Sequence, residues 1–191
     1  HPVAHSFPTR RSSDLADPNQ TDRVIRYAAT HPGNFFIAMG RSKQPVITDE
    51  NGDPFFGPDY RYVYGLHDHI REGTDVALVA MGCMVPRSLE VREILAEKGV
   101  SAAVYSVSCP LCIGPRLLDE LEGYDLVVTY EDHDMDTGMG SKLAIATACF
   151  NKSINLRRKG VTEYGASGSP EDLYRMAGLA PDQVADYILN Q

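Results

Sequence analysis

A pair of cysteines is the first feature of this sequence that could carry chemistry. Cys109-Pro110-Leu111-Cys112 has the C-x-x-C spacing, which serves as a redox couple or as half of a zinc site. The sequence has no second such pair, and no suitably spaced histidine pair, to complete a zinc site. Because Gly114-Pro115 follows, the segment is predicted to be a loop before a helix. We therefore interpret Cys109 and Cys112 as loop thiols rather than a metal or redox site.

Two short runs combine histidine with carboxylates. His67-Asp68-His69 places two imidazoles on one face of a predicted strand, a spacing that can hold a metal, but no third ligand is evident. Glu131-Asp132-His133-Asp134 follows a predicted buried strand, at the edge where open α/β sheets place ligands. Its carboxylates could shift the pKa of the histidine and support acid–base work. They could equally hold a loop or an interface by ion pairs, so both interpretations stay open.

Two further positions could bind an anion. Arg41 follows Gly40 at the end of a predicted buried strand, residues 35–39. The planar, permanently charged guanidinium suits a phosphate, although a structural ion pair is the alternative. Gly138-Met139-Gly140-Ser141 leads into a predicted helix, whose N-terminus can bind an anion. The third glycine of a dinucleotide-binding fingerprint is missing, so that function is weakly indicated.

Alternating strands and helices must position these residues. Asp17-Pro18 predicts a helix start, and a Gly- and Pro-rich linker over 42–61 is the best candidate domain boundary. Short strands are expected at 61–64 and 67–71. The regular pattern that follows predicts strands at 76–81, 102–107, 126–130 and 161–164, with helices at 85–98, 115–121, 141–150, 170–177 and 181–189. This alternation predicts an α/β fold: a three-layer αβα domain with a mostly parallel sheet.

Composition narrows the class of protein. The 191 residues are 43% hydrophobic and 23% charged, which excludes bulk disorder, and no apolar run is long enough to span a membrane. A net charge of −8 without a basic run argues against nucleic-acid binding. Four cysteines without a hydrophobic signal segment favour free thiols and a cytoplasmic location.

The N-terminal residues look foreign to the rest of the chain. The run from His5 to Leu15, HSFPTRRSSDL, resembles one reading frame of a short-read sequencing adapter. We therefore expect residues 1–15 to be an assembly artefact that is disordered, and exclude them from the fold. On this interpretation the natural protein extends upstream of Ala16.

Five segments, in consistent order over residues 16–189, resemble the C-terminal part of transketolase, in the thiamine-diphosphate enzyme superfamily. Residues 73–82 are similar to the first strand of that domain, and 128–141 resemble its E-E-H…G-G-x-G-S run. The other segments are 88–100, similar to the following helix, 164–173, similar to a G-x-S-G-x-P-x-x-L run, and Gly178-Leu179 before the last helix. Each motif is short, but the ordered set is specific.

The resemblance implies a domain organisation. Residues 16–42 would end a pyrimidine-binding domain, as the remnant of a second α/β domain. Residues 43–65 would be a linker, and 66–191 a complete C-terminal domain. An isolated helix and strand would leave apolar faces uncovered, so we expect 16–42 to be poorly supported in this chain.

The resemblance also implies an activity. The family transfers a two-carbon ketol unit between sugar phosphates, using thiamine diphosphate and a divalent cation, Mg²⁺ or Ca²⁺. The G-D-G…N motif of the cofactor site is absent from this sequence, so we expect the fragment to bind no cofactor and to be inactive alone. Arg41 falls where the family holds an arginine that binds a substrate phosphate, and it is our one candidate site residue. Glu131, Asp132 and His133 are interpreted as packing or interface residues.

Partners and alternatives follow from the same resemblance. The fragment would need the missing N-terminal domains or a partner subunit, in a homodimer or heterotetramer, and no nucleic acid or membrane is expected. A deoxyxylulose-phosphate synthase or the beta subunit of a 2-oxoacid dehydrogenase is the alternative within the superfamily. A noncatalytic dimerisation or regulatory module is the alternative outside it.

Overall fold

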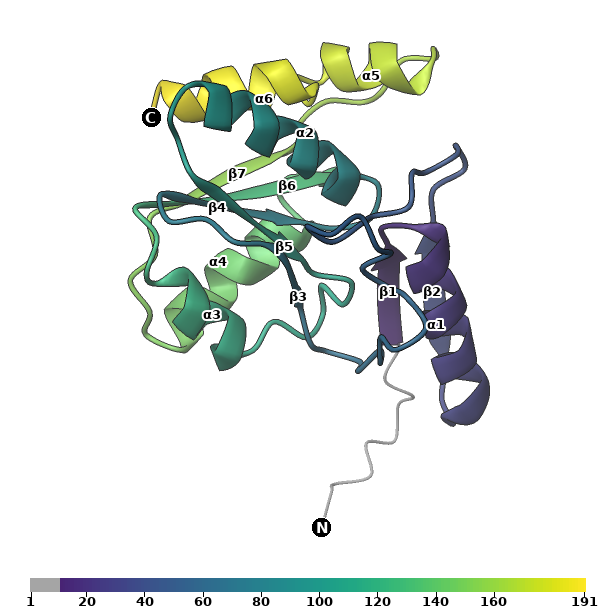
Figure 1. Cartoon of the computed structure of the whole chain (residues 1–191). Coiled ribbons are helices and arrows are strands. Elements are labelled where there is room, and N and C mark those ends of the chain that lie inside the picture. Colours follow the sequence, from purple (N-terminus) through teal and green to yellow (C-terminus); the bar gives the residue numbers. More distant parts are fainter. Residues whose placement is uncertain (1–10) are drawn as a thin grey trace.

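The larger of two β-sheets forms the centre of the molecule. In the computed structural model, which describes residues 11–191, five strands lie in the order β3-β5-β4-β6-β7, all parallel except β3. Helices α2, α5 and α6 cover one face and α3 and α4 the other (Figure 1). The strands are β3 (Asp68–Arg71), β4 (Val76–Ala80), β5 (Ala102–Ser106), β6 (Leu126–Asp134) and β7 (Leu156–Val161); the helices are α2 (Met84–Glu97), α3 (Pro115–Leu121), α4 (Met139–Cys149), α5 (Pro170–Met176) and α6 (Pro181–Leu189). The predicted three-layer αβα class is confirmed.

Burial on both faces explains the apolar runs that predicted the central strands. Every residue of β4 and of β5 is buried. Along β4, Leu78 faces the core beneath α2 and α6, whereas Ala77 and Val79 face the core beneath α3 and α4. A parallel strand covered on both sides needs apolar residues at successive positions, which is why its run is continuous rather than alternating.

A separate β1–α1–β2 unit precedes this domain. β1 (Arg11–Leu15) pairs in parallel with β2 (Phe35–Met39), and α1 (Pro18–Thr30) connects them. The predicted helix start is confirmed, because the Asp17 side chain accepts a hydrogen bond from the Gln20 backbone N–H at 2.7 Å. The strand expected over 35–39 exists. The expectation that it is buried was wrong, since Phe36 and Met39 are more than half exposed.

The expectation of disorder was wrong for residues 11–15; residues 1–10 lie outside the described residues. β2 offers an unpaired strand edge, and backbone pairing with it does not depend on side-chain identity. Leu15, 2% exposed, adds its side chain to a small core with Val24 and Tyr62. Whatever the origin of these residues, they form an ordered strand here.

The linker is packed rather than loose. Ile47 and Phe56 are buried in the main core, and the Ile47 backbone N–H donates to the Asp17 side chain at 3.0 Å. The Arg23 guanidinium donates to the Gly57 carbonyl at 2.9 Å. These contacts hold the linker against both units.

Four predicted strands differ from the structure. The last strand spans 156–161 rather than 161–164. Its sequence, LRRKGV, pairs with β6 through its backbone although half of its residues are charged. Residues 61–64 form no strand, and residues 67–71 shorten to β3 at the antiparallel edge. β6 runs on through Asp134, so the carboxylate-rich run lies within a strand end rather than in a loop.

Among residues 11–191, no helix has the length and apolar character needed to cross a membrane.

Candidate functional site

A cleft of about 600 Å³ opens where the ends of β4 and β6 face the end of β2. β4 is flanked by β5 on one side and β6 on the other, so the chain winds in opposite directions from this point. Open α/β sheets place their ligands at such a switch point, beyond the carboxyl ends of the strands. The residues that line the cleft include Arg41, Lys43, Cys83, Asp132, His133 and Tyr174.

Arg41 lies on the rim of this cleft. It follows β2 in an exposed segment, with Lys43 two residues on. No ion-pair partner of Arg41 lies within 4.0 Å in the described part of the chain. By contrast, the cationic group of Arg87 is engaged, since it pairs with Glu171 at 2.6 Å and lies 4.4 Å from the centre of the Tyr174 ring. Arg41 and Lys43 thus form the basic side of the cleft.

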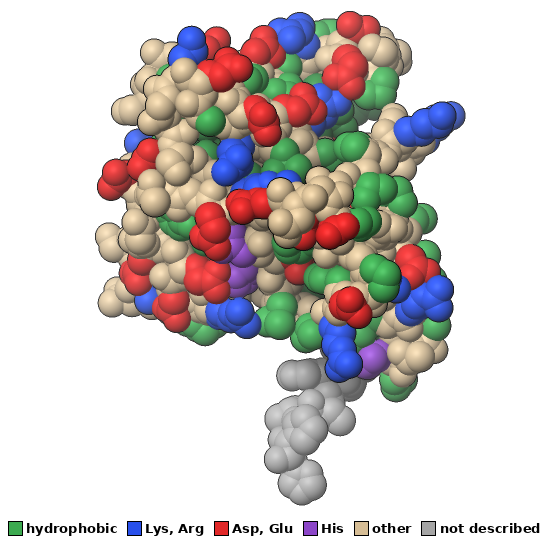
Figure 2. Space-filling view, in the orientation of Figure 1, with side chains coloured by type: hydrophobic (Ala, Val, Ile, Leu, Met, Phe, Trp, Pro, Cys, Tyr) green, Lys and Arg blue, Asp and Glu red, His purple; other side chains and the backbone are tan. Residues whose placement is uncertain are grey.

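Charges of both signs are mixed over one face of the molecule as well as in the cleft. Figure 2 shows acidic and basic side chains interspersed over the visible face, with no broad area of one sign. The net charge of the chain therefore does not predict the charge at the cleft, which depends on local pairs of opposite charge.

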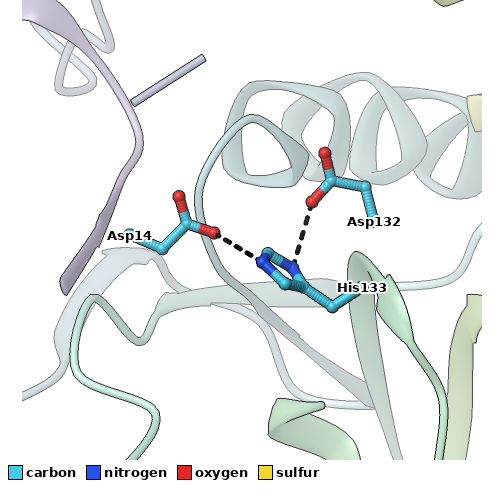
Figure 3. A group of neighbouring side chains, drawn as sticks. All are labelled: Asp14, Asp132 and His133. Atoms are coloured by element: carbon cyan, nitrogen blue, oxygen red, sulfur yellow. Dashed lines mark ion pairs between the residues drawn. The ribbon is translucent and has the colours of Figure 1, made fainter. Parts of the chain in front are cut away.

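His133 lies between two carboxylates from different sheets (Figure 3). Its Nδ1 is 3.3 Å from Asp132 Oδ1, and its Nε2 is 3.6 Å from Asp14 Oδ2. The hydrogen bond with Asp132 raises the pKa of the imidazole, although burial opposes the shift. Each ring nitrogen faces a different carboxylate, which is the arrangement of an imidazolium that bridges two anions.

A metal site is the other interpretation of this group. The three side chains are, within the described residues, the one set whose ligand atoms all lie within 4.8 Å of one another. A bound cation needs one histidine nitrogen and both carboxylates to converge on a single point, and here the two nitrogens are divided between Asp14 and Asp132. The structure therefore favours an ion-paired histidine.

Asp132 also accepts from two further donors. The Cys83 thiol donates to Oδ2 at 3.4 Å, and the Tyr174 hydroxyl donates to the same oxygen at 3.2 Å. Burial opposes ionisation, but His133 and these donors together lower the pKa of Asp132. Burial and the Asp132 charge raise the pKa of the Cys83 thiol to about 11, so the thiol stays protonated and acts as a donor rather than a nucleophile.

Glu131 fills the anion site that the sequence suggested at the start of α4. Its two carboxylate oxygens accept from the backbone N–H groups of Met139 at 2.6 Å and Gly140 at 2.7 Å. A Cβ added at Gly138 would lie 2.1 Å from Glu131 Oε2. The glycines thus allow a buried carboxylate to approach the helix N-terminus, which leaves no room there for an external phosphate.

The two remaining motifs lie outside this cleft. His67 pairs with Glu120 at 2.9 Å, and His69 stacks on Tyr105 with ring centres 4.2 Å apart. Cys109 is buried with its Sγ 2.9 Å from the Tyr62 hydroxyl, while Cys112 is half-buried.

The structure thus brings Arg41 together with Asp132 and His133, and leaves the cysteines and the 67–69 run apart from them. Sequence reasoning missed Cys83, Tyr174 and Asp14, because nothing in local spacing relates them to the end of β6.

The fold and the cleft define a doubly wound α/β domain joined to a smaller β–α–β unit. The chain belongs to the transketolase C-terminal domain family, which it matches over residues 65–184. This confirms the resemblance drawn from the ordered motifs.

Individual relatives support the same family. The chain is 29% identical to a subunit of the apulose-4-phosphate transketolase of Actinobacillus succinogenes, over 92% of this chain and 55% of the relative. It is 30% identical to a 1-deoxy-D-xylulose-5-phosphate synthase of Clostridium botulinum, over 66% of this chain and 21% of that protein. A solved split-gene transketolase, described as an inactive beta4 tetramer, superposes with a TM-score of 0.85 at 28% identity, covering 97% of this chain and 58% of that one. The chain spans about half the length of the first of these relatives.

Proposed function

We propose that this chain is the C-terminal part of a transketolase-type enzyme, which transfers a two-carbon ketol unit between sugar phosphates, and that Arg41 binds the phosphate of a substrate. The observation that supports it most is the position of Arg41. Its guanidinium is exposed on the basic rim of the cleft at the sheet's switch point, without an ion-pair partner in the described residues. A free guanidinium at such a place suits a phosphate monoester.

Thiamine diphosphate would be held elsewhere in the complete enzyme. The described residues do not fit its diphosphate: the N–H groups at the start of α4 already donate to Glu131. At the cleft, the His133 ring lies between the carboxylates of Asp14 and Asp132, so these carboxylates are not open to a cation. We therefore assign cofactor and cation binding to the missing domains or to a partner subunit, within a homodimer or a heterotetramer.

Activity of the restored enzyme tests the proposal. The gene would be completed upstream of Ala16, expressed with its candidate partner subunit, and assayed on xylulose 5-phosphate and ribose 5-phosphate with thiamine diphosphate and Mg²⁺. Cofactor-dependent ketol transfer is the expected result. Formation of 1-deoxy-D-xylulose 5-phosphate would instead support the synthase alternative, which the relative from Clostridium botulinum favours. Absence of any cofactor-dependent turnover would refute both.

Arg41→Ala tests the phosphate contact in that enzyme. Loss of a charged hydrogen bond costs about 1.5–3 kcal/mol, so KM for the phosphorylated substrate should rise roughly 10- to 100-fold. Steady-state kinetics should show little change with an unphosphorylated ketose. Arg61→Ala is the matched control, because Arg61 is exposed in the linker outside the cleft. An unchanged KM in Arg41→Ala would contradict the assignment.

A further inference from the structure

Cys109 and Cys112 are the two ends of one tight turn. The Cys112 backbone N–H donates to the Cys109 carbonyl at 2.9 Å, with Pro110 and Leu111 as the central residues. The first and last Cα atoms of such a turn lie within about 7 Å of each other. A disulfide needs Cα atoms about 4.4–6.8 Å apart, so only side-chain rotation and a small backbone adjustment separate these two thiols from a bond.

The turn lies where the linker meets the sheet. Cys109 Sγ contacts the Tyr62 hydroxyl at 2.9 Å, and both side chains are buried in one small core. Tyr64 and Cys112 pack against that core. Gly65, in the left-handed region with φ of 91°, brings the linker so close that an added Cβ would lie 3.3 Å from the Cys112 Cβ. Both cysteines therefore contact the segment that connects the two units.

From this juxtaposition we propose that Cys109 and Cys112 form a reversible disulfide that loosens residues 60–65, the last part of the linker, from the main domain. The inference stands apart from the proposed enzymatic function, because it concerns the joint between the units and not the cleft. It changes the interpretation drawn from spacing alone, which favoured unreactive loop thiols.

A small-molecule disulfide such as oxidised glutathione supplies the oxidant. Cys112 is half-buried and lines a pocket of about 210 Å³, so it is the accessible thiol. Its thiolate attacks one sulfur of the oxidant, whose S–S bond breaks and releases the first glutathione thiolate. Cys109 then attacks the Cys112 sulfur of the mixed disulfide, forms the protein disulfide and releases the second. The two cysteines lose two electrons and two protons, and oxidised glutathione takes up both pairs to give two thiols.

The structural consequence arises at Tyr62. In this proposal, bond formation draws the buried Cys109 sulfur toward Cys112 and away from the Tyr62 hydroxyl, which it contacts at 2.9 Å. Tyr62 would keep its contact with Ser13 Oγ at 2.9 Å but lose its contact with Cys109, one of its ties to the loop after β5. The linker should then detach locally, while the core of β4 and β5 remains closed.

Mass spectrometry tests bond formation in the full chain. Trypsin releases both cysteines in peptide 99–116, with Cys83 in 72–87 and Cys149 in 143–152. After equilibration of the folded protein in glutathione buffers and alkylation, peptide 99–116 should be two hydrogens lighter and unalkylated, and dithiothreitol should reverse this. Peptide 99–116 found only as the dithiol or as glutathione adducts, while exposed Cys149 becomes modified, would overturn the proposal.

Limited trypsin cleavage after Arg61 tests the consequence. Cleavage should be several-fold faster in the oxidised protein and return to its original rate on reduction, as expected for local opening. Cys112→Ser should abolish the difference, whereas Cys149→Ser should keep it. Equal cleavage rates for a protein shown to carry the disulfide would refute the loosening of the linker. The reduction step needs no variant, so a misfolded Cys112→Ser protein would not obscure the result.

Discussion

Asp14 brings a third carboxyl group to a corner of the molecule that already holds Glu131 and Asp132. Its side chain is 10% exposed, and the Asp14 oxygens lie where a Cβ on Gly82 would be 2.6 Å away. Burial raises the pKa of Asp14 to about 6, with the Asp132 charge adding to the shift and His133 opposing it. The ionised form of Asp14 therefore opposes folding.

Asp14→Asn should stabilise the protein in a pH-dependent way. Because the pKa is higher in the folded state than in the unfolded state, ionisation opposes folding once the pH exceeds about 4, and the penalty is complete above about 6. The free energy of unfolding should rise by about 2 kcal/mol near pH 8 and by only a fraction of that near pH 4.

Urea denaturation at the two pH values measures the difference. Asp136→Asn, an exposed carboxylate in the turn after β6, serves as the control. An equal change at both pH values, or a loss of stability near pH 8, would show that Asp14 is well accommodated by His133.

At the scale of the elements, α4 depends on a side chain from the neighbouring strand. Its N-cap is Gly138, which has no side chain to accept the first N–H groups of the helix. Glu131 replaces that cap from β6, using both oxygens. Burial raises the pKa of Glu131, although the two backbone N–H groups oppose the shift.

Glu131→Gln should therefore destabilise the fold. The amide retains one oxygen and places an NH₂ group against a backbone N–H, which leaves a buried donor without a partner at a cost of about 1–3 kcal/mol. The midpoint of urea unfolding should fall accordingly. Glu163→Gln, at an exposed position, should leave it unchanged. Equal midpoints for both variants would mean that water or a shifted helix start satisfies these donors.

For the whole molecule, the question is how firmly the β1–α1–β2 unit is held. It has only two strands, and β2 leaves Phe36 and Met39 more than half exposed. Its ties to the main domain include the Asp14 N–H to the Ser108 carbonyl at 2.9 Å and the small core around Tyr62. By comparison, β4 is fully buried between two other strands.

Amide exchange should separate the two units. Backbone N–H groups over 35–39 should exchange at least about tenfold faster than those over 76–80, because local opening of a two-stranded sheet exposes little buried area and costs less free energy. Hydrogen–deuterium exchange with peptide resolution measures both segments in one experiment. Exchange over 35–39 as slow as that over 76–80 would contradict the expectation that residues 16–42 are poorly supported.

Much of the main domain could be predicted because its signals are local. Continuous apolar runs predicted β4, β5 and the start of β6, and Asp17-Pro18 predicted α1. The predicted strand at 161–164 was wrong because β7 is an edge strand in which half of the residues are charged, so it carries no continuous apolar signal. β1 was missed because its sequence carries no strand pattern. It is a strand because its backbone pairs with the edge of β2.

The residues of the candidate site could likewise be predicted only in part. Arg41, Asp132 and His133 were singled out from residue type and position at strand ends, and they line one cleft. Cys83 and Tyr174 could not be found, because they come from the residue before α2 and from α5 and meet Asp132 only through the strand order.

By itself, the sequence determined the α/β class, the alternation of strands and helices, and the family, because each depends on residue types at short, regular spacing. The tertiary structure alone decided that Glu131 closes the anion site of α4, that His133 bridges two sheets, and that the Cys109–Cys112 turn packs against the linker. Those contacts join segments that are set side by side by the order of the strands and the packing of the layers. No local pattern encodes that order.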